Sequence, residues 1–290
     1  MNFRQVRKKI KTIGNVKQIT NAMHMVSSVK MKKAQEIALE GLLYRQILEQ
    51  IRNRVVESTD SKTSIYQNVP RESHEKSTKL HILISSNKGL CGSFNFNLFK
   101  FIFNQVDFDG DDFIVLGKKG ADFLIKMGAN ITADFSKQIP FADNTSAIFS
   151  EVSNKFLTGK YSEIYLIYNH FISTLKNEPV KKLLLPIKDQ VDDKDPEMEG
   201  DNANYLIEPS PKEVLEALIA DSLKDALRSA ILESEAAEYS ARMIAMKNAT
   251  DSASDLIYNL TLLRNKLRQA SITTELLDIT TAKESSASAM

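Results

Sequence analysis

Glycine and proline, the two residues that most strongly interrupt helices, are nearly absent from both ends of this chain. Residues 1–69 contain no proline and only Gly14 and Gly41, and residues 212–290 contain neither residue type. All seven prolines fall between these segments. The distribution predicts a long helix at each end of the chain and a mixed region between them.

Apolar residues in both end segments recur at the alternating three- and four-residue spacing of a coiled coil. The first row begins with Phe3, Val6, Ile10 and Ile13 and continues, after a shift of phase, with Val16, Ile19, Met23 and Val26. The second row contains Leu256, Leu260, Leu263, Leu267 and Ala270. We expect the two end helices to pair in an antiparallel coiled coil. Two amphipathic core helices of an ordinary bundle are the alternative.

The region between the end helices alternates short apolar strands with helical stretches. The strand candidates are residues 80–86, 113–116, 163–173 and 179–187, and one helix candidate covers 145–157. Strands that alternate with helices predict βαβ units, and the last two strands could form a hairpin. We expect an N-terminal coiled-coil helix at 1–58, a central α/β domain at 78–205, a C-terminal coiled-coil helix at 210–284 and a frayed tail at 285–290.

Positive charge is concentrated at the start of the chain. Residues 1–33 contain nine basic side chains and no acidic one, although the whole chain has a formal net charge of only +1. Such a segment can bind nucleic acid, anionic lipid or an acidic protein surface. Phe3 is the only aromatic residue there that could stack on bases, and the apolar spacing suits another helix better than lipid. An acidic protein partner is therefore favoured.

No motif for catalysis, metal binding or cofactor binding is recognisable. The turn from Lys88 to Ser93 follows a strand and precedes a helix, as phosphate-binding loops do, but its glycines match neither nucleotide-binding fingerprint. We interpret it as a tight turn, with a nucleotide site as the less favoured alternative. Cys91 is expected to be a small packing residue, and the four histidines lack metal-ligand spacing. No apolar run approaches the roughly 18 residues of a membrane-spanning helix.

Four stretches of the chain closely resemble the gamma subunit family of F-type ATP synthases. They are Ile19–Gln35 (ITNAMHMVSSVKMKKAQ), Ser86–Asn95 (SNKGLCGSFN), Glu233–Ile257 and Arg264–Ile279 (RNKLRQASITTELLDI). The resemblance implies an α/β protein with a long antiparallel coiled coil of N- and C-terminal helices and a central Rossmann-like domain. It implies a central rotor stalk, without a catalytic site or cofactor, that couples ion-driven rotation of the membrane c-ring to ATP synthesis or hydrolysis on beta subunits and regulates ATPase activity and proton flow.

The resemblance also implies partners and contact residues. The partners are the hexamer of three alpha and three beta subunits, the epsilon subunit and the c-ring, with one copy of the chain per complex and no nucleic acid. The location is peripheral, on the cytoplasmic face of the cell membrane. The residues expected to contact the hexamer are Lys9, Met23, Lys30, Lys33, Arg242, Arg268, Gln269, Thr273 and Glu275. Tyr205 and Glu208 are expected to contact the c-ring and epsilon.

Two other function classes remain open from the residues alone. One is an enzyme that uses the α/β domain, and the other is a coiled-coil adaptor that binds nucleic acid through the basic segment. The stretches at the two ends favour the rotor interpretation over both.

Overall fold

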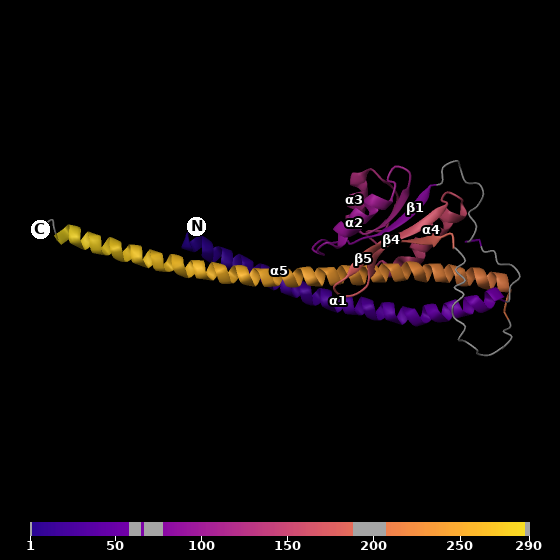
Figure 1. Cartoon of the computed structure of the whole chain (residues 1–290), viewed down its shortest axis with the longest axis horizontal. Helices are drawn as coiled ribbons and strands as arrows, with labels where there is room; N and C mark the ends of the chain where they lie inside the picture. Colours follow the sequence, from indigo (N-terminus) through magenta and orange to yellow (C-terminus); the bar gives the residue numbers. More distant parts are fainter. Residues whose placement is uncertain (1, 58–64, 67–77, 188–206, 288–290) are drawn as a thin grey trace. The chain divides into compact units, whose positions relative to one another are not determined.

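The computed structural model describes residues 2–57, 65–66, 78–187 and 207–287, which form two units. The terminal unit comprises residues 1–28 and 242–290, and the central unit comprises residues 29–241. Two long helices, α1 (Phe3–Glu57) and α5 (Pro211–Ala287), contribute residues to both units (Figure 1). The acidic run at 189–201 lies outside the described residues.

The start of each long helix is fixed by side chains that cap its first turn. At α1, the Gln5 backbone N–H donates to Asn2 Oδ1 over 3.0 Å, and the Asn2 N–H donates to Gln5 Oε1 over 3.1 Å. This reciprocal pair is a capping box. At α5, the Glu213 N–H donates to Ser210 Oγ over 3.3 Å, and Pro211 occupies the first helical position, where no N–H is needed. Both helices therefore begin where the local sequence satisfies their free backbone donors.

Within the terminal unit, the inward face of α1 keeps one unbroken alternation of three and four residues. Positions 6, 10, 13, 17, 20, 24 and 27 are all buried or half-buried, whereas Val16, Ile19 and Val26 are exposed. The predicted phase shift is therefore wrong. If Val16 and Ile19 faced inward, the two spacings after Ile13 would both be three residues. Helix α1 would then have to be overwound to keep these residues on its inward face. The helix instead turns Thr20 and Ser27 inward.

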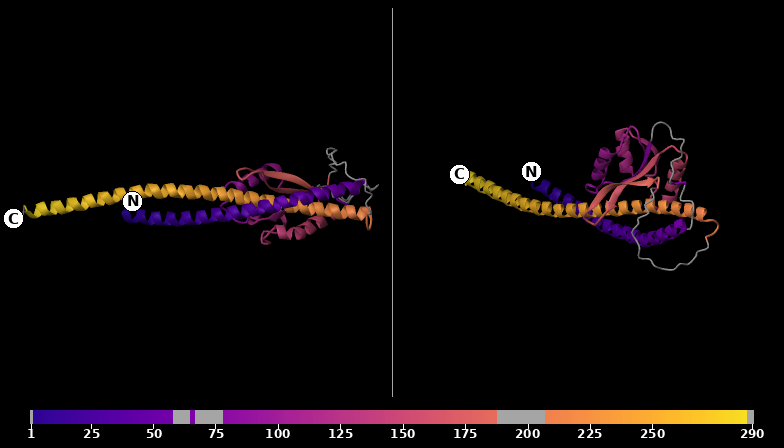
Figure 2. Two further views of the ribbon diagram at one scale, coloured as in Figure 1. Left: turned by 90° about the horizontal axis from the view of Figure 1, so that it is seen from below. Right: turned by 45° about the vertical axis from the view of Figure 1, so that its right-hand side comes forward.

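The facing part of α5 lies beside α1 in both views of Figure 2. Thr20 Oγ1 lies 2.8 Å from Thr250 Oγ1, so two hydroxyls meet at the inward face. Further along α5, Ile257, Leu260, Arg264 and Leu267 are half-buried, whereas Leu256 and Leu263 are exposed. The sequence prediction for Leu260 and Leu267 is confirmed, and that for Leu256 and Leu263 is wrong, because the inward row passes through Ile257 and Arg264.

The central unit contains a five-stranded sheet in the order β3-β2-β1-β4-β5. Its strands are β1 (Lys79–Ile84), β2 (Asp112–Leu116), β3 (Asn130–Asp134), β4 (Glu163–Phe171) and β5 (Asn177–Leu185). All neighbours are parallel except β4 and β5, which form the predicted antiparallel hairpin. The α/β fold class with its two long helices is confirmed. The edge strand β3 was not predicted, because its NITAD sequence is short and only half-buried.

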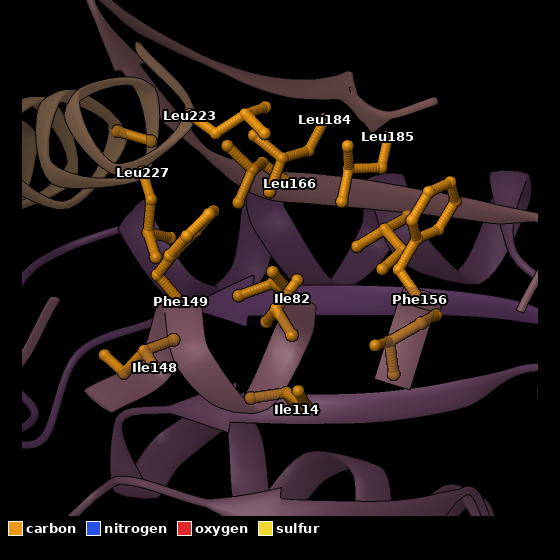
Figure 3. Packing of buried hydrophobic residues seen from close by; sticks show 14 of the residues in the cluster. Ile82, Ile114, Ile148, Phe149, Phe156, Leu166, Leu184, Leu185, Leu223 and Leu227 are labelled. Carbon is orange, nitrogen blue, oxygen red and sulfur yellow. The ribbon is translucent and has the colours of Figure 1, made fainter. Parts of the chain in front are cut away.

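Helices cover both faces of the sheet. One face packs against α4 (Thr145–Leu157) and the first part of α5, where Figure 3 shows Phe149 and Leu227 together and Leu223 close to Leu166. The other face packs against α2 (Phe94–Gln105) and α3 (Lys118–Met127), through Leu98 and Leu124 among others. Because α5 completes the cover on one face, the sheet and the first part of this long helix share one apolar core.

The carboxyl ends of β1 and β2 approach each other so closely that a glycine is needed between them. Gly117 follows β2 with a φ of 107°, and a Cβ there would lie 2.1 Å from the backbone oxygen of Ser85. Ser85 Oγ in turn accepts from the Gly120 N–H over 2.8 Å, at the start of α3. This contact fixes where α3 begins relative to β1.

Replacing Gly117 with alanine should therefore destabilise the chain by more than about 2 kcal/mol, because neither the dihedral angle nor the space admits a side chain. Chemical denaturation followed by circular dichroism measures the free energy of unfolding. Gly89→Ala is the matched control, since no atom lies within 4 Å of its added Cβ. Equal stabilities for the two variants would show that the close approach does not constrain the fold.

Candidate functional site

The carboxyl edge of the sheet is where open α/β folds bind ligands, at the point where strand order reverses. Here that point lies between β1 and β4, and the turn after β1 lies beside it. The turn satisfies its own polar groups: Ser86 Oγ donates to the Lys88 carbonyl over 2.9 Å, and Asn95 Nδ2 donates to Ser86 Oγ over 2.7 Å. Leu90 and Gly92 adopt positive φ angles of 64° and 57°, as a tight turn requires.

Helix α5 covers this turn. Cys91 and Phe94 are buried against Ala237, with Phe171 and Ala241 packed around them. The prediction that Cys91 is a packing residue is thus confirmed. A ligand at the edge would have to displace a helix whose small side chains already fill the space, so the edge does not offer the open crevice that a dinucleotide needs.

One buried titratable group lies at the opposite edge of the sheet. His81 is fully buried on β1, and its ring lies between those of Phe113 and Tyr165, with centroids 5.4 and 5.6 Å away. Its Nε2 lies 2.8 Å from Asp111 Oδ2, and its Nδ1 has no hydrogen-bond partner among the described residues. Burial lowers the pKa of His81, although Asp111 opposes the shift. The ring is therefore neutral and donates through Nε2.

No metal centre accompanies these groups: the described part of the chain holds no cluster of three histidine, cysteine or carboxylate side chains that could bind an ion. None of the described helices combines the length and apolar character needed to cross a membrane.

The terminal unit exposes large apolar side chains on both of its helices. On α1, Ile19 is 60% exposed and Val26 is 55% exposed. On α5, every residue from 268 to 283 is exposed, and the large apolar ones are Ile272, Leu276, Leu277 and Ile279. Apolar surface of this extent on a helix pair indicates a surface that another protein covers. Sequence reasoning assigned the α1 residues to the inward seam and so missed their outward position.

The sequence profile of the family described as "ATP synthase" matches residues 2–285. A protein of Akkermansia muciniphila named ATP synthase gamma chain is 33% identical over 289 residues, which cover 97% of this chain and 98% of the relative. This chain belongs to the ATP synthase gamma chain family. A gamma chain of Roseiflexus castenholzii is 36% identical, with 95% of each chain covered.

The fold is also that of a solved rotor. A chain of the Euglena gracilis mitochondrial ATP synthase rotor matches with a TM-score of 0.63 and 20% identity, over 93% of this chain and 98% of that one. At this level of identity the match shows the shared fold. The gamma chain family therefore accounts for both the sequence and the arrangement of long helices and α/β domain.

The residues expected to contact partners in this gamma chain fall into three groups by exposure. The exposed side chains are those of Lys9, Lys30, Lys33, Glu208, Arg268, Gln269, Thr273 and Glu275. Met23 is half-buried, and Arg242 is buried with 7% of its surface exposed. Tyr205 lies outside the described residues.

Several of these side chains already make contacts within their own unit; in the terminal unit, Thr273 Oγ1 donates to the Gln269 carbonyl over 3.0 Å. In the central unit, the Lys30 ammonium lies 5.3 Å from the centre of the Tyr239 ring, a cation–π distance. In the terminal unit, Glu275 Oε1 accepts from Ser271 Oγ over 3.1 Å. Arg268 and Gln269 are adjacent on an exposed part of α5, where a partner could reach both.

The pKa shift of His81 predicts loss of stability in mild acid. Below about pH 6.5 the unfolded chain protonates this histidine, whereas the buried ring takes up its proton only at a lower pH, so in this range the unfolded state binds more protons and the free energy of unfolding falls. Above that pH both states are neutral and the contribution is complete. Urea denaturation at pH 7.5 and 5.5 should show a smaller acid loss in His81→Gln, which can still donate to Asp111.

Titratable groups far from His81 are shared by wild type and variant and cancel in this comparison, whereas the groups that face His81 contribute to the difference together with it. Those facing His81 are Asp111, Lys181 and Lys79. Elsewhere, burial and the nearby Glu238 raise the pKa of Glu235 to about 7, which makes its contribution fall as pH rises, the opposite direction. Identical acid losses in the two proteins would contradict the role given to His81.

Proposed function

We propose that this chain is the central rotor stalk of an F-type ATP synthase. It couples ion-driven rotation of the c-ring to ATP synthesis or hydrolysis at beta subunits, and it regulates ATPase activity and proton flow. The observation that carries the proposal is the outward apolar surface of the terminal unit in a chain of the gamma family. The hexamer of alpha and beta subunits covers that surface. The chain is then a peripheral protein on the cytoplasmic face of the membrane.

A rotor of this kind acts on the beta subunits only through its contacts with them. A beta subunit changes its nucleotide affinity because its contacts with the stalk differ from one rotor angle to the next, and each tenfold change requires about 1.4 kcal/mol of difference. The stalk must therefore present unequal faces. The terminal unit fits this need, since exposed Val16, Ile19 and Val26 lie on one helix and exposed Leu276, Leu277 and Ile279 on the other.

Two further observations support the proposed partners and the lack of a catalytic role. Lys9, in the terminal unit, and Lys33, in the central unit, are both exposed, as contacts to an acidic surface of beta would be. Ala237 of α5 packs against Cys91 and Phe94 at the ligand edge of the sheet, so a nucleotide bound there would compete with this helix. The epsilon subunit and the c-ring complete the set, with Glu208 among the contacts to them.

The first test separates the inward from the outward apolar residues of α1. In Ile19→Ser/Val26→Ser, the free energy of unfolding of the free chain should change by less than about 0.5 kcal/mol, because both side chains are exposed. Binding to alpha and beta subunits should weaken by about tenfold or more, because each buried aliphatic side chain contributes about 1.5–3 kcal/mol. Titration of the labelled chain into the hexamer measures this affinity.

Val6→Ala is the control, since Val6 is fully buried in the terminal unit. It should lower the stability of the free chain by about 1–3 kcal/mol. If the double serine variant binds the hexamer as tightly as wild type, the outward surface is not the docking surface.

The second test concerns Arg268 and Gln269. Their side chains are exposed, so Arg268→Ala and Gln269→Ala should leave the melting temperature of the free chain unchanged. In the reconstituted complex, each should lower the rate of ATP turnover, because a hydrogen bond that differs between rotor angles is lost. Lys283→Ala, on the same exposed part of α5, is the comparison. Full turnover in both variants would remove these residues from the contact set.

A further inference from the structure

A cluster of polar side chains joins α5 to the sheet and to α1 inside the central unit. We call it the Glu233 cluster, and its members are Arg45, Tyr168, His170, Asp225, Ser229 and Glu233. His170 Nδ1 on β4 lies 2.6 Å from Glu233 Oε2, and Ser229 Oγ donates to Glu233 Oε1 over 3.2 Å. One carboxylate thus bonds to a side chain one turn back on its own helix and to a strand 63 residues away.

The neighbours of this carboxylate bind it in a half-buried setting. Tyr168 is 6% exposed, and its burial together with the charge and hydrogen bond of Glu233 raises the pKa of the phenol. Tyr168 therefore keeps its proton and acts as a donor. Hydrogen bonds to a charged group contribute about twice as much as neutral ones, and more where water is excluded. The His170 side chain is 46% exposed, so its bond to Glu233 is partly open to water, whereas Tyr168 is buried.

Helix α1 reaches the same cluster through Arg45. Its guanidinium donates to Ser229 Oγ, and its Nε lies 3.7 Å from Asp225 Oδ2. Burial raises the pKa of Asp225, and the charges of Arg45 and Arg228 oppose that rise. The polar contacts of Arg45 and Glu233 therefore link α1, α5 and β4. The α5 residues that take part lie within about two turns of that helix.

Most of the remaining contact between α5 and the sheet is apolar. Leu215, Ile219, Leu223 and Leu227 are buried in the core that α5 shares with β4 and α4. Apolar packing contributes most of the free energy that holds α5 on the sheet, but it depends only weakly on the direction of each contact. The Glu233 carboxylate, in contrast, can bond to His170 on β4 only when α5 has one particular rotation and one particular position along its axis. Ser240 adds a second directional contact, since its hydroxyl donates to the Thr174 carbonyl in the β4–β5 turn.

We propose that Glu233 is a positioning residue that fixes the register of α5 on β4, so that the α/β domain and this helix turn together. The inference rests on the proposed rotor function. If the sheet could slide along α5 or rotate around it, part of the rotation of one would not be transmitted to the other. Glu233 does not bind a partner or nucleotide in this role. It acts through His170 and Ser229.

The first experiment uses the free full-length chain. Amide hydrogen exchange in β4 should rise about tenfold in Glu233→Ala, which corresponds to the loss of about 1.4 kcal/mol that a charged hydrogen bond supplies. His170→Ala should raise it similarly, and the double variant should add little. Glu213→Ala, an exposed glutamate of α5, is the control. Equal exchange in the Glu213 and Glu233 variants would overturn the proposal.

The second experiment uses the reconstituted complex in vesicles. With Glu233→Ala, ATP hydrolysis should persist while the number of ions pumped per ATP falls, and Glu233→Gln should recover part of that ratio because its side-chain amide can still hydrogen-bond to His170 on β4. An unchanged ratio together with faster exchange would show that the cluster only stabilises the fold. If the wild-type chain itself failed to restore ATP turnover to alpha and beta subunits, the rotor function would fail instead.

Discussion

The alternation of three and four residues along α1 is the constraint from which much of the functional interpretation follows. A helix can present only one such row to its neighbour without overwinding, and in α1 that row contains Thr20 and Ser27. The apolar residues Val16, Ile19 and Val26 are consequently turned to the outside. Hydroxyls thus occupy part of the contact between the two helices, while several aliphatic side chains lie on their outer faces. Those faces are buried when a surrounding protein covers the pair.

The central unit has the strand order of an open α/β sheet with a point of reversal between β1 and β4. The order β3-β2-β1-β4-β5 creates a point of strand reversal, yet Ala237 of α5 packs there against Cys91 and Phe94. The long helix is thereby packed against that edge. The same helix completes the apolar core on one face and carries the carboxylate of Glu233. The sheet thus packs along the first part of α5 and holds this helix in place.

Much of this fold could be predicted from the sequence, because its signals are local. The missing glycines and prolines predicted both long helices, and alternating apolar runs predicted four of the five strands, including the β4–β5 hairpin. The strand β3 escaped because an edge strand such as NITAD needs little apolar character. The inward row of α1 escaped because apolar residues occupy two competing faces between Val16 and Val26. The contacts of Glu233 join residues far apart in sequence, for which no spacing rule exists.

The exposed part of α5 from residue 268 to 283 has a consequence for the life of the subunit before assembly. Sixteen residues without tertiary cover form only a marginal helix in water, so their hydrogen-bond ladder opens readily in the free chain. Proteases cleave helical segments whose hydrogen bonds open. Partner subunits that surround α5 would shield its peptide bonds from cleavage. Residues 268–283 of the free chain should therefore be cleaved more readily than the same residues in the assembled complex.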